Sequence, residues 1–159
     1  MPPSEPHAPT QIKPKTLADY LDVMSKAAFQ SGISWKVVEA KWPGTREVLA
    51  GFDPQVLATW GDSEVDTAAT DTRLIRNRKK IQAITDNARS MLEVAQTPAA
   101  FRKYLRSHED FDVTVKALRK RFKFLGESGC YYFLYVVGEP VPEYAAWCES
   151  RGVTPMTMR

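Results

Sequence analysis

The residues with the clearest chemical potential lie in one short segment, residues 116–126, which reads KALRKRFKFLG. Five cations and no acid occur within residues 116–123, and Gly126 follows them. A glycine that opens a helix leaves the backbone N–H groups of residues 127–130 free to face an approaching group. Helix N-termini and surrounding cations both favour anions such as phosphate. Lys123 and Gly126 are therefore the first candidates for contact with a phosphate.

A second basic segment, residues 73–80, has a similar composition, with five cations and no acid. The whole chain has 22 Lys and Arg against 19 Asp and Glu, so removing these ten cations leaves 12 against 19, a net charge of −7. An acidic body with two concentrated basic segments is typical of a protein that binds a phosphate backbone. Two solvated helix faces would have the same composition, so both interpretations stay open. The candidate contacts in this segment are Arg76, Arg78, Lys79 and Lys80.

Metal and nucleophile chemistry have little support in the sequence. Cys130 and Cys148 are the only cysteines, too few for a disulfide framework or a four-cysteine zinc site. His7 and His108 have no partner at ligand or triad spacing. We therefore expect no metal site and no cofactor.

The elements that position the basic segments are predicted to be helices. Apolar residues recur at helical spacing, most clearly in the stripe Ile81, Ile84, Ala88 and Met91. Thr16, Ser34 and other capping residues precede several such stripes, and glycines or prolines end them. The sequence predicts an all-α domain of about eight to ten short helices.

Length and composition place these helices in one domain. A chain of 159 residues with 43% hydrophobic and 26% charged residues can bury one ordinary core. We expect a disordered proline-rich tail over residues 1–15, the domain over residues 16–151 and a second tail over residues 152–159. No apolar run approaches the roughly 18 residues that span a bilayer, and the opening residues lack the hydrophobic region of a signal peptide. The expected compartment is the cytoplasm.

Residues 112–137 combine these signals into a helix-hairpin-helix. One helix is predicted to end at Arg121, a turn with apolar anchors covers residues 122–126, and a second helix begins after Gly126. An ordinary antiparallel helix pair with a glycine turn is the alternative. The basic flank and the placement of the glycine favour contact with DNA.

Four blocks of the sequence resemble, in the same order, the DNA-3-methyladenine glycosylase I family of the helix-hairpin-helix superfamily. The blocks are residues 30–35 (QSGISW), 52–58 (FDPQVLA), 74–89 (LIRNRKKIQAITDNAR) and 116–133 (KALRKRFKFLGESGCYYF). The resemblance covers most of the span from residue 16 to residue 138. It implies binding to damaged duplex DNA, extrusion of an N3-alkylated purine and hydrolysis of its N-glycosidic bond in base excision repair.

The resemblance also implies roles for individual residues. Trp35 falls on the pocket tryptophan of the family and Gln30 on the same side of the pocket, with Phe29 and Tyr20 as nearby aromatic residues. An ordinary core position explains Trp35 as well. The phosphate-binding hairpin of the family falls on Lys123, Gly126, Ser128 and Gly129.

The chain departs from the family pattern in three places. The cysteine and tyrosine segments that open family members are replaced by a proline-rich stretch, and Glu143 stands where a zinc-ligating histidine is expected, so a zinc site is not predicted. Ala27 stands where the family has the glutamate that reads the base, and alanine cannot accept a hydrogen bond. Glu143 is a candidate replacement carboxylate for catalysis, although starting a helix at Pro142 explains it equally well.

Two functional hypotheses follow from the resemblance and these departures. The first is a divergent glycosylase that excises a 3-methyladenine-type base. The second is a catalytically inactive descendant that still binds DNA. Both predict duplex DNA as the partner, no association with a membrane and a monomeric protein. An all-α domain with no role in nucleic-acid binding would require the two basic segments to lie on opposite faces.

Overall fold

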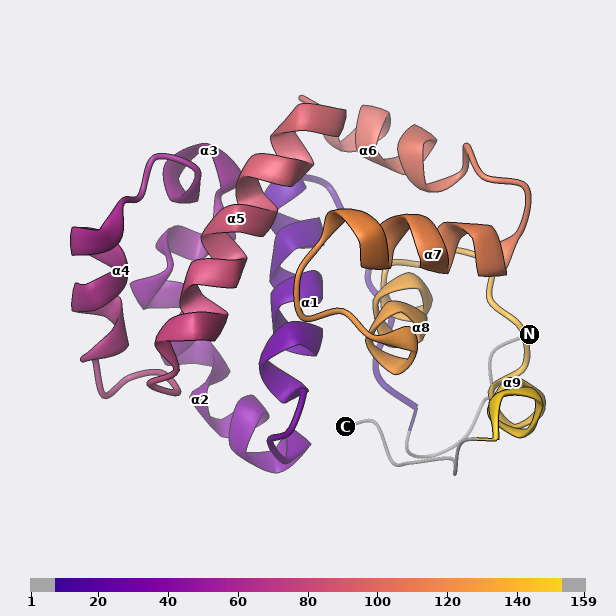
Figure 1. Cartoon of the computed structure of the whole chain (residues 1–159), viewed down its shortest axis with the longest axis horizontal. Helices are drawn as coiled ribbons and strands as arrows, with labels where there is room; N and C mark the ends of the chain where they lie inside the picture. The colour runs from indigo at the N-terminus through magenta and orange to yellow at the C-terminus, as the bar shows by residue number, and fades with distance from the viewer. Residues whose placement is uncertain (1–7, 153–159) are drawn as a thin grey trace.

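The computed structural model describes residues 8–152, and this part of the chain is helical with no β-strand (Figure 1). The prediction of an all-α fold is confirmed. The described elements are α1 (Leu17–Gln30), α2 (Trp35–Val48), the 3-10 helix η1 (Ala50–Phe52), α3 (Pro54–Leu57), α4 (Asp62–Ala69), α5 (Arg78–Val94), α6 (Pro98–Leu105), α7 (Phe111–Arg121), α8 (Glu127–Val136) and α9 (Tyr144–Arg151).

Side-chain caps explain where most of the helices begin. Thr16 accepts a hydrogen bond from the Asp19 N–H, and Asp19 bonds back to the Thr16 backbone, which completes a capping box at the start of α1. Four further helices begin after a residue whose side chain accepts a hydrogen bond from a backbone N–H of the first turn. These residues are Ser34, Asn77, Thr97 and Asp110, before α2, α5, α6 and α7 respectively. The second helix of the hairpin, predicted to begin after Gly126, begins at Glu127, and the helix predicted from Pro142 begins at Tyr144.

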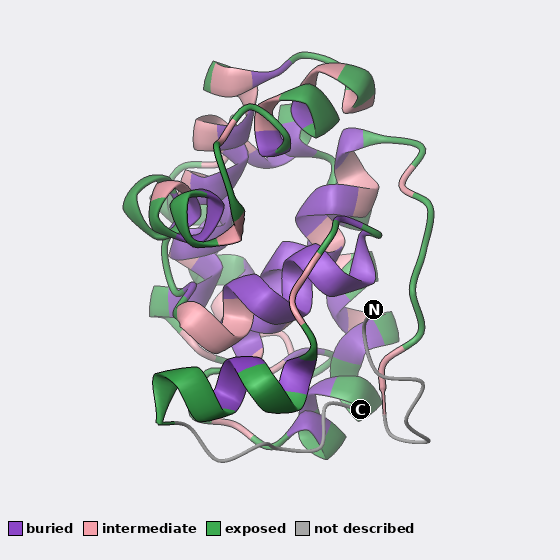
Figure 2. Cartoon of the chain, turned by 90° about the vertical axis from the view of Figure 1, so that its right-hand side faces the viewer, coloured by how far each residue is buried: buried purple, intermediate pink, exposed green. Residues whose placement is uncertain are grey.

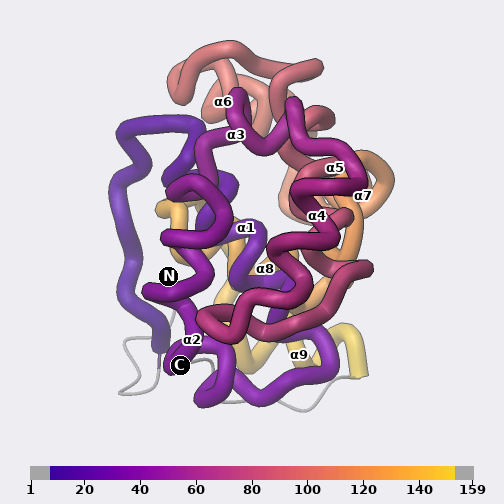
Figure 3. The backbone as a smooth tube through the Cα atoms, turned by 90° about the vertical axis from the view of Figure 1, so that its left-hand side faces the viewer, coloured from indigo at the N-terminus to yellow at the C-terminus, as the bar shows by residue number. Residues whose placement is uncertain are grey.

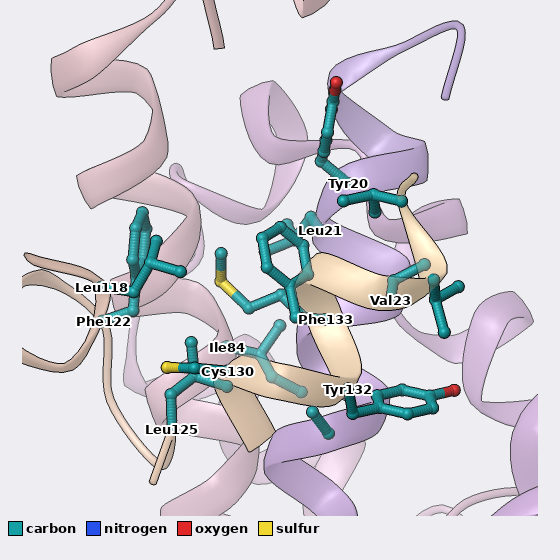
Figure 4. Close-up of a cluster of buried hydrophobic side chains, with 14 of the residues drawn as sticks. Tyr20, Leu21, Val23, Ile84, Leu118, Phe122, Leu125, Cys130, Tyr132 and Phe133 are labelled. Carbon is teal, nitrogen blue, oxygen red and sulfur yellow. The ribbon is translucent and has the colours of Figure 1, made fainter. Parts of the chain in front are cut away.

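Helix α8 forms the centre of the core. Its residues from Cys130 to Val136 are all buried, and it packs against α1 on one side and α7 on the other. Figure 4 shows Leu21 and Val23 of α1 and Leu118 of α7 pointing toward the side chains of α8. The buried surface runs through the middle of the molecule (Figure 2). The aromatic run is therefore a helix that is buried around its whole circumference from Cys130 to Val136.

Helix α5 supports one side of the molecule and also contacts the core. It packs against α3 and α4, which lie beside it in Figure 3, and against α1. Besides Thr85, its buried face includes two further polar side chains, Lys80 and Asn87, among apolar ones. Both take part in the surface described below.

The N-terminal segment differs from the sequence prediction in its described part. The Ile12 N–H donates to the Val136 carbonyl at 2.8 Å, and Gln11 Nε2 donates to the Tyr135 carbonyl at 2.8 Å. Residues 11–12 are therefore bonded to the end of α8 and are not a free tail. Residues 1–7 and 153–159 of the predicted tails lie outside the described part. None of the described helices has the length and apolar character needed to cross a membrane.

Candidate nucleic-acid interface

Helices α7 and α8 form the predicted hairpin, joined by the turn at residues 122–126 (Figure 1). The turn is held to the core by two apolar residues, Phe122 and Leu125, which are both buried. Lys123, Phe124 and Gly126 alternate with these anchors and are exposed. The alternation directs one side of the turn into the core and the other side toward solvent.

Asn87 of α5 fixes the backbone of this turn. Its Oδ1 accepts a hydrogen bond from the Lys123 N–H at 2.8 Å, and its Nδ2 donates to the Lys123 carbonyl at 3.1 Å. Asn87 is buried, so these bonds are protected from competing water. Lys123 Nζ also bonds Asp86 Oδ2 of α5 at 2.7 Å. The hairpin is therefore presented by α5 as a rigid feature.

The N-terminus of α8 exposes backbone N–H groups at the end of the hairpin. Gly126 is the N-cap, and no side chain of the described chain caps this helix. A Cβ added at Gly126 would meet no atom within 4 Å, so the space in front of these amides is open. Glu127, the acid beside them, pairs with Arg151 of α9, with 3.1 Å between Arg151 Nε and Glu127 Oε2. This arrangement offers donors and partial positive charge to an anion.

A shallow groove of about 820 Å³ follows the hairpin. It is lined by Ser31 and residues 119–126, which include Arg119, Lys120, Arg121 and Lys123 and no acidic residue. Two of these cations have acidic partners outside the lining, Arg121 with Glu93 at 3.7 Å and Lys123 with Asp86, whereas Arg119 and Lys120 have no ion pair within the described chain. Cations lining one concave surface raise the local potential and attract a phosphate backbone.

The second basic segment is only partly available for such contacts. Arg78 bonds Asp66 Oδ1 at 2.5 Å and Asp62 Oδ1 at 3.3 Å, so two carboxylates of α4 already hold its guanidinium. Arg76 and Lys79 are exposed and, within the described chain, free of ion pairs. These two remain the candidate phosphate contacts of this segment.

The prediction that Lys80 contacts DNA is wrong. Its side chain is buried, and its ammonium donates to the Phe29 carbonyl at 2.7 Å and to the Ser31 carbonyl. Burial lowers its pKa below the usual lysine value. Lys80 satisfies carbonyls at the end of α1, where α1 itself supplies no donors. Its role is structural, since it ties α1 to α5.

Lys80 nevertheless shows that the two basic segments meet. Its Nζ lies 5.8 Å from the centroid of the Phe124 ring at the tip of the hairpin. The start of α5, the end of α1 and the hairpin therefore adjoin one another. The alternative in which the basic segments lie on opposite faces is not supported.

The residues predicted to form the base pocket are mostly packed in the core. Trp35 contacts Tyr132 with 4.6 Å between ring centroids, Phe29 contacts Trp42 at 5.9 Å, and Tyr20 contacts Phe101 at 4.9 Å. These three predicted pocket aromatics are buried, whereas Gln30 is partly exposed. Within the described chain, the buried indole N–H of Trp35 has no hydrogen-bond partner.

Ala27 lies at a close approach of α1 and α8. It is buried, and its Cβ would be 3.8 Å from a Cβ built on Gly129. Two small residues allow the two helices to pack closely here. Gly129, which the resemblance placed on the phosphate-binding hairpin, therefore also serves helix packing, while Ser128 is partly exposed in the first turn of α8.

A cleft of about 1000 Å³ lies beside Tyr132 and was not predicted from the sequence. Its walls come from the segment at residues 8–15, from α1, from α2 and from α8, and they include Asp22, Lys26, Glu39 and Arg46. The carboxylates already have partners: Asp22 pairs with Arg46 at 2.6 Å and Glu39 with Lys26 at 2.5 Å. Burial raises the pKa of the Tyr132 phenol. Residues so far apart in the chain share no local pattern that could have revealed this cleft.

Glu143 has a structural role that conflicts with its predicted catalytic one. It is the N-cap of α9, and its carboxylate oxygens accept hydrogen bonds from the N–H groups of Ala145 and Ala146, both at 2.9 Å. These bonds lower the pKa of the carboxyl, so it stays ionised near neutral pH, and both of its oxygens are engaged by the start of α9. We therefore correct the assignment of Glu143 to a helix cap.

The region where a family-type zinc site would lie is aromatic. Tyr131, Tyr144 and Trp147 pack together, with 4.8 Å between the rings of Tyr131 and Trp147, and Phe111 covers them. Among the described residues, no three His, Cys, Asp or Glu side chains gather as metal ligands would. The residues present do not fit a zinc site.

Comparison with known proteins places these features in a family. The family model for methyladenine glycosylase matches residues 18–121. DNA-3-methyladenine glycosylase 1 of Escherichia coli is 32% identical over 130 residues, which cover 69% of this chain and 70% of that protein. The DNA-3-methyladenine glycosylase of Haemophilus influenzae is 30% identical over the same shares. A crystal structure of 3-methyladenine DNA glycosylase I aligns with a TM-score of 0.69 and 26% identity, over 86% of this chain and 90% of that one. The chain belongs to the methyladenine glycosylase family.

Proposed function

We propose that this protein is a DNA glycosylase of base excision repair that binds duplex DNA through the α7–α8 hairpin and excises an alkylated purine of the 3-methyladenine type. The observation that carries the proposal is the hairpin itself, with open amides at Gly126 and four cations along one groove. The family to which the chain belongs and the names of its relatives support the same activity.

The first step of the proposed mechanism is the grip on the DNA backbone. A phosphate accepts hydrogen bonds from the first amides of α8, and Lys123 and its neighbours neutralise the adjoining phosphates. Extruding a base costs a few kcal/mol of stacking and pairing, which these contacts offset. Because Asn87 holds the turn rigid, little ordering is required at the moment of binding.

The second step is cleavage of the glycosidic bond. An N3-alkylated purine is cationic, so it is a good leaving group and needs little help from a general acid. Electron-rich rings stabilise a cation that stacks on them, and Trp35 and Tyr132 form such a pair beside the 1000 Å³ cleft. Within the described chain, the buried indole N–H of Trp35, one member of this pair, has no hydrogen-bond partner. As the bond between the sugar C1′ and the base nitrogen breaks, its electron pair leaves with the base, which departs as a neutral molecule. Water bonds to C1′ and releases a proton to solvent, which leaves an abasic site.

The protein is proposed to act as a monomer, because one chain carries the whole hairpin surface. The cytoplasm is the proposed compartment. Light scattering after size-exclusion chromatography, with and without a short duplex, tests the first part. A 1:1 complex supports a monomer, and a 2:1 complex contradicts it.

A single-turnover assay tests the activity. Purified protein is incubated in excess with a duplex that contains 3-methyladenine, and free base and abasic sites are measured beside a mock incubation. Release above the spontaneous rate, reduced in Trp35→Ala, supports the glycosylase. Circular dichroism of the variant separates a lost pocket from a lost fold.

A second candidate function, a catalytically inactive DNA-binding protein, is supported by Ala27. The family resemblance places a base-reading glutamate there, and Asp22 and Glu39, two carboxylates that line the cleft beside Tyr132, are already paired with Arg46 and Lys26. Tight binding of the lesion duplex without release of base would favour this candidate.

A further inference from the structure

Phe124 is an apolar ring exposed at the tip of the hairpin. It has 42% of its surface accessible, whereas its neighbours Phe122 and Leu125 are buried anchors. Lys123 and Gly126 flank it on the exposed side, and it lines the basic groove. Isolated exposed apolar residues are ordinary on protein surfaces, so exposure alone assigns no role.

The backbone of Phe124 supplies a second, independent observation. Its φ is +59°, in the left-handed region that non-glycine residues rarely occupy. The other non-glycine residues with positive φ among those described are Ala50 and Phe52, and the Phe52 ring is buried, so packing accounts for its conformation. Phe124 gains no such burial. Strain that persists at an exposed position is a marker of function.

The surrounding structure maintains this strain. Asn87 fixes the preceding residue through two hydrogen bonds, and Leu125 anchors the following one. One part of the ring faces Lys80, whose ammonium is 5.8 Å from the ring centroid. A purely structural role for Phe124 would be to cover this buried cation, and that role leaves the exposed part of the ring unexplained.

The chemistry of the groove identifies what the exposed ring meets. Four cations and the open amides of α8 bind phosphate, so a DNA backbone runs along this surface under the proposed function, on which the inference rests. The bases of a duplex are covered by stacking. The apolar surface available next to a backbone phosphate is therefore the deoxyribose.

We propose that Phe124 is a DNA-contact residue that packs against the deoxyribose beside the phosphate held at the N-terminus of α8. The left-handed backbone turns the ring outward to make this contact. Phe124 fixes the position of the strand along the groove, while the cations supply the attraction.

The test compares duplex affinity over a series of salt concentrations for the wild type, Phe124→Ala and Phe124→Leu. We expect Phe124→Ala to bind about tenfold more weakly, which corresponds to roughly 1.4 kcal/mol or about 55 Å² of buried apolar surface. Phe124→Leu should stay within about threefold of the wild type, because an aliphatic side chain also packs on a sugar. The slope of log affinity against log salt should not change, because the ring displaces no counterions.

Val56→Ala is the matched control, since Val56 is 42% exposed on α3 and lies outside the groove. We expect its affinity to equal that of the wild type. Wild-type affinity in Phe124→Ala would overturn the proposal, and so would equal losses in the alanine and leucine variants, which would indicate ring stacking.

Phe124→Gly distinguishes a role of the ring in DNA contact from a role in folding stability. Glycine accepts the positive φ without strain, so this variant should melt at or above the wild-type temperature and still lose affinity as Phe124→Ala does. A melting temperature that falls in both variants would favour the structural role of covering Lys80. If the wild type does not bind duplex DNA, the proposed function fails together with this inference. If it binds and Lys123→Gln flattens the salt slope, wild-type affinity in Phe124→Ala overturns only the inference.

Discussion

Gly126 and Gly129 lie one helical turn apart on α8 and have opposite surroundings. Gly126 faces open space beside four cations, and no side chain caps the amides behind it. Gly129 is partly exposed and faces the buried Ala27 of α1 at a close contact between two helices. The first turn of α8 thus belongs on one side to a binding surface and on the other side to the core.

The contrast shows how the DNA-holding and base-reading parts of such a domain can diverge separately. Phosphate binding by the hairpin depends on backbone amides and on cations, and neither requires particular neighbouring side chains. At the position where the resemblance implies a base-reading glutamate, Ala27 is buried against α8. Substitutions on either side of this contrast should therefore have different effects on stability and on DNA binding.

Restoring the glutamate tests whether the space at Ala27 is closed. Ala27→Glu places a carboxylate at a buried contact with Gly129, so we expect the free energy of unfolding to fall by about 3 kcal/mol. Ala18→Glu, in the first turn of the same helix, is the control and should change stability little. Denaturant titration measures both. A stable Ala27→Glu variant that releases base faster would mean that the pocket is open.

Substitutions of Lys80 and Lys79 compare a buried structural cation with an exposed candidate for DNA contact in the same segment. Lys80→Met leaves two carbonyls at the end of α1 without donors, and we expect a loss of about 2 kcal/mol in stability. Lys79→Met should change stability by less than about 0.5 kcal/mol. Urea unfolding followed by circular dichroism measures both. Equal stabilities would contradict the burial of Lys80.

Gly126→Ala tests the open amides of α8 without removing a charge. The new Cβ meets no atom of the protein, so the fold should tolerate it, while the methyl group stands in front of the amides and should weaken duplex binding about tenfold. Gly44→Ala is the opposite case, because its Cβ would lie 2.4 Å from the Arg73 carbonyl oxygen and should destabilise the fold. Unchanged affinity in Gly126→Ala would remove these amides from the interface.

Alkaline pH tests the buried side of α8. Burial raises the pKa of Cys130 from 9.0 to about 12 and also raises the pKa values of Tyr131 and Tyr132. The unfolded chain releases the Cys130 proton first as pH rises, so stability should fall steadily between about pH 9 and pH 12. Melting temperatures across this range measure the effect, and Cys130→Ala should reduce it. A constant melting temperature above pH 9 would contradict the burial.

Much of the fold is readable from the sequence, because local signals define it. The caps at Thr16, Ser34 and Asn77 and the glycine before α8 fix helix starts to within about one residue. The sequence pattern predicts that Lys80 is exposed and gives no role to Asn87, because basic and polar residues are usually found at the surface. Their spacing of seven places them on the buried face of α5, and that spacing is the signal that could have identified them.

The rest of the site depends on long-range packing. The cleft beside Tyr132 is formed by four segments that are distant in the sequence. The left-handed backbone of Phe124 occurs at a residue that is not glycine, so the residue type does not indicate it. The role of Glu143 was open in the sequence, since a cap and a catalytic carboxylate require the same residue type. Its bonds to Ala145 and Ala146 identify the cap.

The salt dependence of duplex binding in Lys123→Gln decides whether the hairpin holds the DNA backbone. Lys103→Gln on α6, also an exposed lysine, is the control. If the hairpin holds the DNA backbone, Lys123→Gln should lower the slope of log affinity against log salt by about 0.9 while Lys103→Gln leaves it unchanged. Equal slopes in the wild type and Lys123→Gln would contradict the assignment of the hairpin as the DNA-binding surface.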